Sequence, residues 1–319
     1  MAKRKLKKSV KLSSFLLILL LMLTLVGIKL YKNYQYRQTY EYKLLQINYT
    51  LDETKILIKN LNDNELEIIL KKERNTNIIK FVSEKYFIFN NLDRYLEYLN
   101  KNENKEINNV ITLVNVNRDR DYYKEPKATN IENKELMLVN KYHYLDENYT
   151  PEDIIKISLT YAYEGNSIDS VVYNAFKELT EDAKKEGHTI VINSSYRDYN
   201  SQKEIWESRK DLYGTRKADE YAARPGYSEH QTGYAIDVSD YYDVNDEFGK
   251  TDSFLWMKEN CYKYGFILRY PEDKEDITGY SYEPWHYRYV GKDAALKIKN
   301  ENITYDEYFA YYIENARSN

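Results

Sequence analysis

Cysteine is almost missing from this chain of 319 residues, in which Cys261 is the only one. A single thiol excludes an intramolecular disulfide and any zinc site built from several cysteines. Because its neighbours in sequence are apolar and aromatic, we expect Cys261 to be a small core residue and not a nucleophile. Proline and glycine are also scarce, at 5 and 10 residues, whereas tyrosine is abundant at 36, which we interpret as compositional bias. A hydrophobic content of 42% is enough for a core and excludes a disordered chain.

The chain has no excess of positive charge beyond its N-terminus. Six basic residues lie within the first eleven positions, and removing them takes the net charge from −4 to about −10. An acidic remainder of this kind does not favour binding to nucleic acid, and we predict no such partner.

A long apolar run follows these basic residues, from Leu12 or Phe15 through Ile28. At about seventeen residues it is long enough to span a bilayer. A cleavable signal peptide begins in the same way, but the residues after the run are bulky and basic and offer no small-residue cleavage site. We therefore predict that residues 1–31 form an uncleaved, single-pass signal anchor, with a cleaved signal as the alternative. The basic flank then stays in the cytoplasm and the rest of the chain lies outside the cell membrane. An extracellular protein without disulfides suits a bacterium.

The region after the apolar run has its apolar residues at helical spacing, and we predict a mainly helical extracellular region over residues 32–132. Asp52 and the stretch from Asn62 to Asn64 are candidate helix caps. Only the stretch from Ile107 to Val116 is compatible with a strand. Because no residues here have metal or nucleophile spacing, we interpret the region as a helical stalk, with a spacer or wall-contacting module as the alternative.

A domain boundary is predicted near residue 132, because a charged run and Pro126 interrupt the helical pattern there. Residues 133–319 are predicted to form one catalytic domain. Its patterns indicate a helix at 170–185, a strand at 188–193 and a second helix at 199–211.

Two short segments of this domain carry the pattern of a metal site. His230 precedes Asp237 across a glycine turn, and further along the chain Glu283 stands three positions before His286. Two histidines and one aspartate form a three-ligand set of the kind that leaves a fourth zinc position open, so we predict a Zn2+ site at these three residues. Glu283 is left over to act as a base.

The spacing within the first segment requires a turn. His230 and Asp237 are an odd number of residues apart, so on one continuous strand their side chains face opposite ways. Gly233 can supply the turn, because glycine readily adopts a positive φ. We expect a short strand at 234–238, with Asp237 on the same face as Ala235 and with His230 reaching in from the preceding loop.

Four motifs occur in a fixed order in this domain. They are Ser195-Tyr196-Arg197, Ala223-Arg224-Pro225-Gly226, Ser228-Glu229-His230-Gln231-Thr232-Gly233 with Asp237, and Glu283-Pro284-Trp285-His286-Tyr287. Together they resemble the VanY-type D-alanyl-D-alanine carboxypeptidases, a family of zinc peptidases, from about Asn133 to Gly291. The resemblance implies a hedgehog-like α+β fold in which a small antiparallel sheet with flanking helices holds one zinc. It also implies activity on the C-terminal D-amino acid of peptidoglycan stem peptides.

The resemblance further implies a role for each matching residue. The three metal ligands are those already named, and Glu283 would move a proton from water to the leaving amine. Arg197 would hold the terminal carboxylate or the developing oxyanion, because a planar guanidinium suits a carboxylate better than lysine does. Ser195, Gln202 and Ser228 would orient the peptide by hydrogen bonds.

Other residues near the motifs have simpler interpretations. His143 and His188 lie outside the motifs and are expected to be hydrogen-bonded or surface residues. Arg224 and Arg288 either contact the substrate or brace loops. Trp285 either packs against the neighbouring ligand or lines the cleft.

Three functions are compatible with these patterns. The leading hypothesis is a membrane-tethered zinc D,D-carboxypeptidase that removes D-alanine from pentapeptide stems. The second is an L,D-carboxypeptidase acting on tetrapeptide stems. The third is a non-catalytic wall-binding domain, which Glu283 disfavours because a domain without turnover has no need of the base. The sequence makes no prediction of oligomeric state.

Overall fold

The computed structural model describes residues 2–240 and 246–315, and for residues 2–12 and Asp246 it describes the backbone alone. The chain divides into two compact units, Met1–Leu96 and Glu97–Asn319. The domain boundary predicted near residue 132 stays a prediction.

The first unit is helical, as predicted. Its elements are α1 (Ala2–Gln38), α2 (Tyr40–Gln46), α3 (Leu51–Asn60), α4 (Asp63–Ile69), α5 (Thr76–Val82) and the beginning of α6 (Leu92–Lys101). Within α1, Ser13–Gln38 is long and apolar enough to cross a membrane, and its side chains are not buried against other parts of the chain. The helix is thus a candidate membrane anchor by length and composition. The basic side chains predicted to flank it lie outside the described side chains.

One of the two predicted caps is correct. Asn62 caps α4, accepting a hydrogen bond from the backbone N–H of Glu65. The cap of α3 is Thr50 and not Asp52, because Thr50 and Glu53 form a reciprocal capping box. Asp52 lies in the first turn of α3, where a negative charge favours the helix dipole.

The strand expected from Ile107 to Val116 is wrong, because this segment forms helix α7 (Ile107–Asn115). Its buried apolar residues are Val110, Ile111, Leu113 and Val114, which recur at helical spacing. A short apolar run rich in β-branched residues suits either structure, and here packing of one helical face decides.

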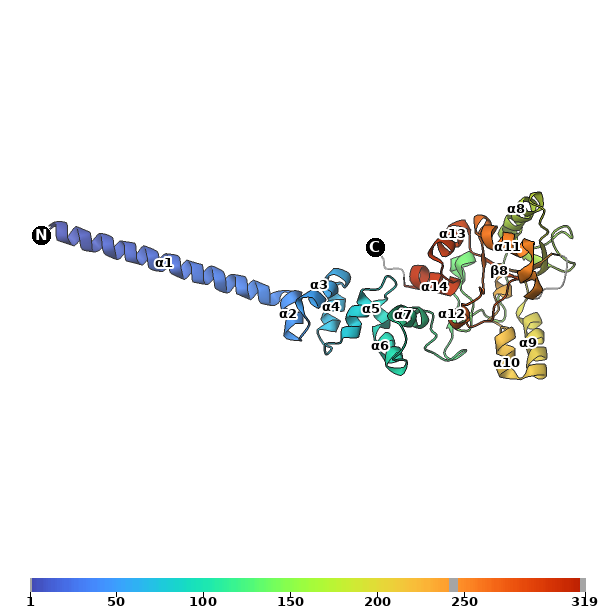
Figure 1. Cartoon of the computed structure of the whole chain (residues 1–319), viewed down its shortest axis with the longest axis horizontal. Helices are drawn as coiled ribbons and strands as arrows, with labels where there is room; N and C mark the ends of the chain where they lie inside the picture. The colour runs from blue at the N-terminus through green and yellow to red at the C-terminus, as the bar shows by residue number, and fades with distance from the viewer. Residues whose placement is uncertain (1, 241–245, 316–319) are drawn as a thin grey trace. The chain divides into compact units, whose positions relative to one another are not determined.

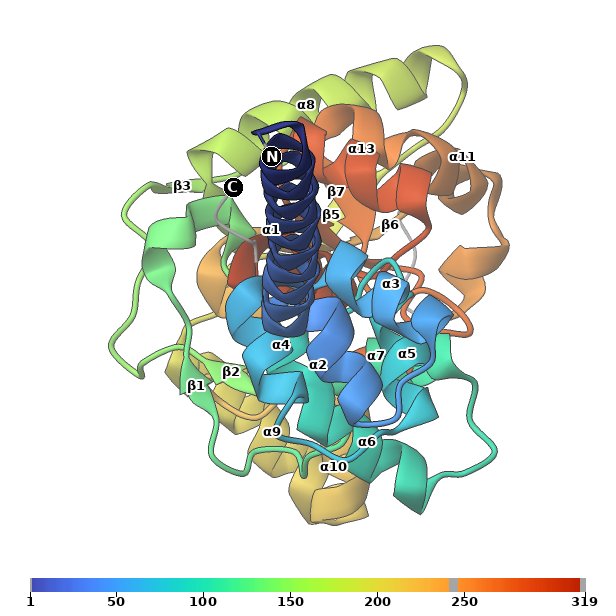
Figure 2. The same ribbon diagram turned by 90° about the vertical axis from the view of Figure 1, so that its left-hand side faces the viewer.

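The second unit contains the remaining elements. Its helices are α7, α8 (Ser170–Lys185), α9 (Tyr199–Tyr213), α10 (Thr215–Tyr221), α11 (Asp252–Asn260), α12 (Glu275–Thr278), α13 (Lys292–Glu301) and α14 (Tyr305–Phe309). Its strands are β1 (Lys127–Ala128), β2 (His143–Tyr144), β3 (Ile154–Lys156), β4 (Ser167–Asp169), β5 (Val191–Ser194), β6 (Ala235–Ser239), β7 (Phe266–Leu268) and β8 (His286–Tyr289). Helices α9 and α10 lie side by side, away from α8 and α13 (Figures 1 and 2).

A four-stranded antiparallel sheet with the order β5-β6-β8-β7 forms the centre of this unit. The predicted small antiparallel sheet with flanking helices is confirmed. Helix α8 has the predicted bounds, and α9 extends two residues further than expected. The first predicted strand begins later than expected, since β5 starts at Val191.

The two faces of the sheet have different environments. Ile236 and Val238 of β6, with Tyr287 of β8, pack into the main apolar core. Because side chains alternate along a strand, Asp237 and His286 face the other side. The core is completed by residues of α8 and α11 and by the segment after α11: Val172, Phe176, Leu179, Phe254, Trp256, Met257 and Cys261.

Cys261 is a buried core residue, as expected. Burial raises the pKa of its thiol to about 12, so the reactive thiolate is not populated near neutral pH.

A second apolar cluster holds helices α13 and α14 beside β7. It contains Leu138, Ile267, Val290, Ala294, Ala295, Ile298, Tyr305, Tyr308 and Phe309. This packing fixes α14, which carries Asp306.

Candidate metal centre

Three predicted ligands converge on the face of the sheet opposite the main core. Ligand atoms of His230, Asp237 and His286 all lie within 4.8 Å of one another. Asp237 and His286 are direct partners across β6 and β8, and His286 Nδ1 lies 3.0 Å from Asp237 Oδ1. His230 comes from the short 3-10 helix Glu229–Thr232, and its Nε2 lies 3.3 Å from Asp237 Oδ2.

The ring of His230 is oriented by a backbone carbonyl. Its Nδ1 lies 2.7 Å from the carbonyl oxygen of Ser195. Because a carbonyl can only accept, Nδ1 carries the hydrogen and Nε2 presents its lone pair toward Asp237. A second hydrogen bond that fixes the tautomer is typical of a metal-binding histidine.

The donor set fits a zinc ion. Two imidazole nitrogens and one carboxylate oxygen, each about 2 Å from a single ion, lie about 3–4 Å apart, which agrees with the observed separations. Burial alone raises the pKa of Asp237, but His230 and His286 hold it below its ordinary range, so the carboxylate is charged. The three residues can therefore hold one divalent metal ion and leave a coordination position open.

The other two histidines lie apart from this group. His143 is buried, with Nδ1 3.1 Å from Asn140 Oδ1, and its ring packs against Phe309. His188 lies beside Trp256. Both are structural residues, as expected.

The turn between His230 and Asp237 is made by Gly233, as predicted. Its φ of +76° is left-handed, and its carbonyl accepts a hydrogen bond from the backbone N–H of Asp169. A Cβ at this position lies 2.8 Å from Ile154 Cδ1. Both the backbone conformation and the neighbouring side chain therefore favour glycine here.

Replacing Gly233 with alanine is expected to lower the free energy of unfolding by about 1–2 kcal/mol, because an L-residue is strained in the left-handed region. The change also shifts His230 and is expected to weaken metal binding. Gly187→Ala is the control, since Gly187 has a φ of +90° but no atom within 4 Å of an added Cβ. Urea unfolding of the full chain in detergent, with metal titration, checks this. Equal loss of metal affinity in both variants contradicts the local effect.

Glu283 lies beside the ligand group, on irregular backbone before β8. Its backbone N–H donates to the carbonyl of Tyr270, and its own carbonyl accepts from the N–H of His286. Its Oε2 lies 3.8 Å from His286 Nδ1, and the side chain is 17% exposed. Burial raises the pKa of Glu283 to about 7, with Asp237 adding to the effect. A carboxylate with a pKa near neutrality is suited to proton transfer.

Arg197 reaches the same pocket from the connection between β5 and α9. Its backbone N–H donates to the carbonyl of His230. Its Nε is buried and has no hydrogen-bond partner within residues 2–240 and 246–315. Burial lowers the pKa of the guanidinium, while Asp237 and Glu283 oppose this shift. A buried donor without a partner favours an anionic ligand at this position.

A pocket contains both the ligand group and these two side chains. Its lining includes Arg197, Gln202, Ile205, Arg209, Tyr221, Ala222, Ala223, Ser228, Glu229, His230, Asp237, Tyr270, Tyr280, Glu283, Trp285 and His286. Helices α9 and α10 contribute Gln202, Ile205, Arg209 and Tyr221 to this lining, which also contains the three metal ligands.

The three predicted peptide-orienting residues have different environments. Gln202 lines the pocket and donates to the carbonyl of Ala223 at 2.8 Å, and its buried Oε1 has no partner in the part of the chain that the structure describes. Ser228 also lines the pocket, and its Oγ accepts from the backbone N–H of His230. Ser195 is not among the lining residues, because its Oγ donates to Asn166 at 2.7 Å. Its contacts favour a supporting role, and substrate contact stays a prediction for all three.

Arg224 and Arg288, which the sequence left as either substrate contacts or loop braces, make contacts that brace loops. Arg224 makes two hydrogen bonds to the carboxylate of Asp219, at 2.9 and 2.8 Å. Arg288 is fully buried and donates to the carbonyl of Met137 at 2.8 Å. Trp285 lines the pocket, in agreement with the interpretation that it lines the cleft.

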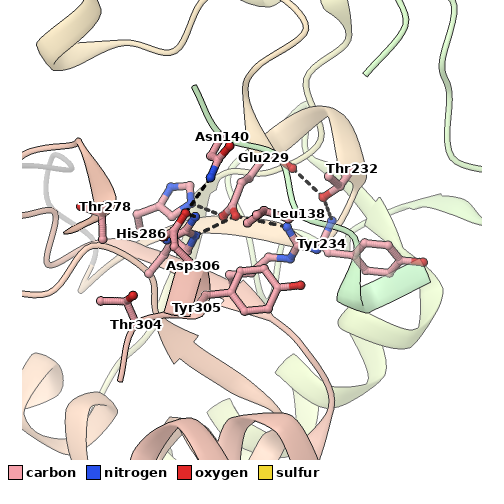
Figure 3. Close-up of polar contacts among 12 residues, drawn as sticks. Leu138, Asn140, Glu229, Thr232, Tyr234, Thr278, His286, Thr304, Tyr305 and Asp306 are labelled. Carbon is pink, nitrogen blue, oxygen red and sulfur yellow. Dashed lines mark hydrogen bonds and ion pairs between the residues drawn. The ribbon is translucent and has the colours of Figure 1, made fainter. Parts of the chain in front are cut away.

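Sequence reasoning missed a buried charged network behind His286. Glu229 contacts His286 and Arg269, and Arg269 in turn binds Asp306 of α14 (Figure 3). The only signal for Glu229 was its place beside His230. Arg269 and Asp306 belong to no motif and carry no spacing that relates them to the site.

The arrangement is that of a metallopeptidase centre: a metal ligand set, a carboxylate of raised pKa and an arginine with a buried free donor, among the described residues, in one pocket. The family model of VanY, described as D-alanyl-D-alanine carboxypeptidase, matches residues 165–292. This range contains the metal ligands, Glu283 and Arg197.

Curated proteins and solved structures show the same relationship. YodJ of Bacillus subtilis (strain 168) is 45% identical over 181 residues, which are 54% of this chain and 66% of YodJ. The bifunctional D-Ala-D-Ala dipeptidase and D-Ala-D-Ala carboxypeptidase VanXYC of Enterococcus gallinarum is 33% identical over 57% of this chain and 97% of that protein. The structure of the LdcB LD-carboxypeptidase has 42% identity and a TM-score of 0.56, covering 59% of this chain and 91% of that one.

These matches place the chain in the VanY family of D-alanyl-D-alanine carboxypeptidases. The match spans slightly less than two thirds of the length of YodJ.

Proposed function

We propose that this protein is a zinc-dependent carboxypeptidase that removes the C-terminal D-alanine from peptidoglycan stem peptides. The observation that carries the proposal is the joint placement of His230, Asp237 and His286 with Glu283 and Arg197 in one pocket. Family membership supports the same reaction class.

Arg197 selects the end of the peptide. Its guanidinium binds the substrate's terminal carboxylate, which supplies an acceptor for the buried Nε that has no partner among the described residues. An internal peptide segment has no carboxylate there and leaves the charge without a partner. The residue therefore favours removal of one C-terminal residue over internal cleavage.

Zinc, when bound, supplies Lewis acidity that polarises the scissile carbonyl and makes water more acidic. Glu283 accepts a proton as water oxygen bonds to the carbonyl carbon. It then donates that proton to the amine as the C–N bond breaks, which releases D-alanine and restores the carboxylate. Its pKa near 7 suits both halves of this transfer.

The N-terminal helix supports a location for this activity. Ser13–Gln38 is a candidate membrane span, and the basic residues before it favour a cytoplasmic N-terminus. We propose a single-pass protein of the bacterial cell membrane whose catalytic unit lies outside, where stem peptides are found.

A second specificity is favoured by one observation. The LdcB LD-carboxypeptidase is 42% identical to this chain, a higher identity than that of the D-Ala-D-Ala enzyme VanXYC at 33%. The alternative substrate is a tetrapeptide stem, in which D-alanine follows an L-centre.

Zinc removal and a pair of peptides test both parts of the proposal. The full chain in detergent is expected to release D-alanine from a pentapeptide stem, to lose this activity with a chelator and to regain it with added zinc. Mass spectrometry of matched pentapeptide and tetrapeptide digestions separates D,D from L,D activity. A pentapeptide with an amidated C-terminus is the control and is expected to stay intact. Release of D-alanine from neither free peptide by the zinc-loaded protein contradicts the proposed function.

A further inference from the structure

A completely buried carboxylate lies directly behind one metal ligand. Glu229 precedes His230 in the chain, yet its side chain turns toward the other histidine, and its Oε2 lies 3.4 Å from His286 Nε2. The Glu229 side chain has no exposed surface. His286 Nδ1, the opposite ring nitrogen, faces Asp237 at 3.0 Å. The imidazole is therefore held between two carboxylates, one on the metal side and one behind it.

Two arginines fix the carboxylate of Glu229. Its Oε1 accepts from Arg269 Nε at 2.7 Å and lies 3.3 Å from Arg288 Nη1. A carboxylate that is paired with guanidinium groups in this way offers its other oxygen as an acceptor, so the hydrogen between Glu229 Oε2 and His286 belongs to Nε2.

The second carboxylate of the network anchors Arg269 from α14. Asp306 receives two hydrogen bonds from Arg269, at 2.6 and 3.2 Å, and a third from Asn140 Nδ2 at 2.8 Å. Figure 3 shows Asn140, Asp306, Glu229 and His286 gathered together. Each member is buried. The position of the Glu229 oxygen is thus set by a continuous chain of polar contacts that ends outside the pocket.

We propose that Glu229 is a positioning residue for the metal ligand His286. By accepting the Nε2 hydrogen it fixes the tautomer in which Nδ1 offers its lone pair beside the ligand atoms of His230 and Asp237, and so strengthens zinc binding. The inference rests on the zinc of the proposed function. It adds a residue that does not touch the ion and a link from α14 to the metal centre.

Two substitutions distinguish whether Glu229 positions His286 or only neutralises the charges of Arg269 and Arg288. Glu229→Gln keeps the length of the side chain but loses the charge that favours the Nε2 hydrogen. Glu229→Asp keeps the charge beside Arg269 and Arg288 but withdraws the oxygen from His286. If Glu229 only neutralises the arginines, the aspartate variant binds zinc as the wild type does.

Zinc affinity measured against a competing chelator is the readout, with the full chain in detergent. Both Glu229 variants are expected to bind zinc about 10–100-fold more weakly than the wild type. Asp306→Asn is the matched control, since it weakens the same network but leaves the contact between Glu229 and His286 in place, and a smaller loss is expected. In the cobalt-substituted protein, the visible absorption bands are expected to shift in the Glu229 variants.

The inference is overturned if Glu229→Asp binds zinc with wild-type affinity. It is also overturned if Asp306→Asn and Glu229→Gln lose zinc affinity to the same extent. A measurement on the wild type tests the inference even if the variants do not fold. 15N-histidine NMR of the zinc-loaded wild type is expected to show His286 protonated at Nε2. Protonation at Nδ1 overturns the inference. If the wild type does not bind zinc, the proposed function itself is overturned. This outcome differs from those above, in which the wild type binds zinc and only the role of Glu229 is overturned.

Discussion

Replacing Glu283 with glutamine is expected to slow D-alanine release by about 10²–10⁴-fold while zinc stays bound. The amide has the shape of the carboxylate but cannot accept a proton from water or return one to the amine. Glu283 lies 3.8 Å from a ligand nitrogen and outside the group of three ligands, so the ligand set is unchanged. Turnover by mass spectrometry and zinc content by metal analysis check the prediction.

Glu272→Gln is the control for this substitution. Glu272 lies on the same connection between β7 and β8 but is exposed, and its replacement is expected to leave turnover unchanged. Loss of zinc together with activity in Glu283→Gln means that Glu283 supports the ligands and is not the base. Retained activity assigns the proton transfer to another group.

Replacing Arg197 with methionine is expected to lower kcat/KM for the free peptide by about 100- to 4,000-fold. Removing one partner of a buried charge pair costs about 3–5 kcal/mol, and each 1.4 kcal/mol is a factor of ten. In the protein without substrate the same change is expected to raise the free energy of unfolding, because it removes a buried Nε donor that has no hydrogen-bond partner among the described residues. Activity and stability therefore change in opposite directions.

Arg209→Met is the matched control, since Arg209 lines the same pocket but is exposed to solvent. Kinetics with free and amidated peptides and urea unfolding are the measurements. Arg197→Met is expected to remove most of the preference for the free carboxylate, whereas Arg209→Met retains it. An unchanged preference in Arg197→Met assigns carboxylate binding to another residue.

Local patterns in the sequence were sufficient for the turn and strand that carry His230 and Asp237. The odd spacing of His230 and Asp237, with a glycine between them, predicted a turn into a strand, and the structure has both. The strand itself was predicted to within one residue, because alternation and β-branched residues agree there. Convergence with His286 was predicted from ligand chemistry and family resemblance, since its pairing with Asp237 depends on strand register.

Long-range contacts account for what was missed. Glu229, Arg269 and Asp306 meet only when β7, α14 and the 3-10 helix before β6 come together, and no local pattern connects them. Ser195 was predicted from its motif to bind substrate, but its hydroxyl is used by Asn166 and its carbonyl by His230. The failure at α7 has a simpler cause, since its apolar run fits either a helix or a strand in isolation.

The direct pairing of Asp237 with His286 ties metal binding to the assembly of the sheet. Shifting β8 by one residue relative to β6 inverts its faces, so that His286 enters the apolar core and Tyr287 takes its place beside Asp237. Such a mispaired chain cannot bind the ion at full strength. Because a ligand stabilises only the states that bind it, a metal ion bound at this site favours the correct strand alignment.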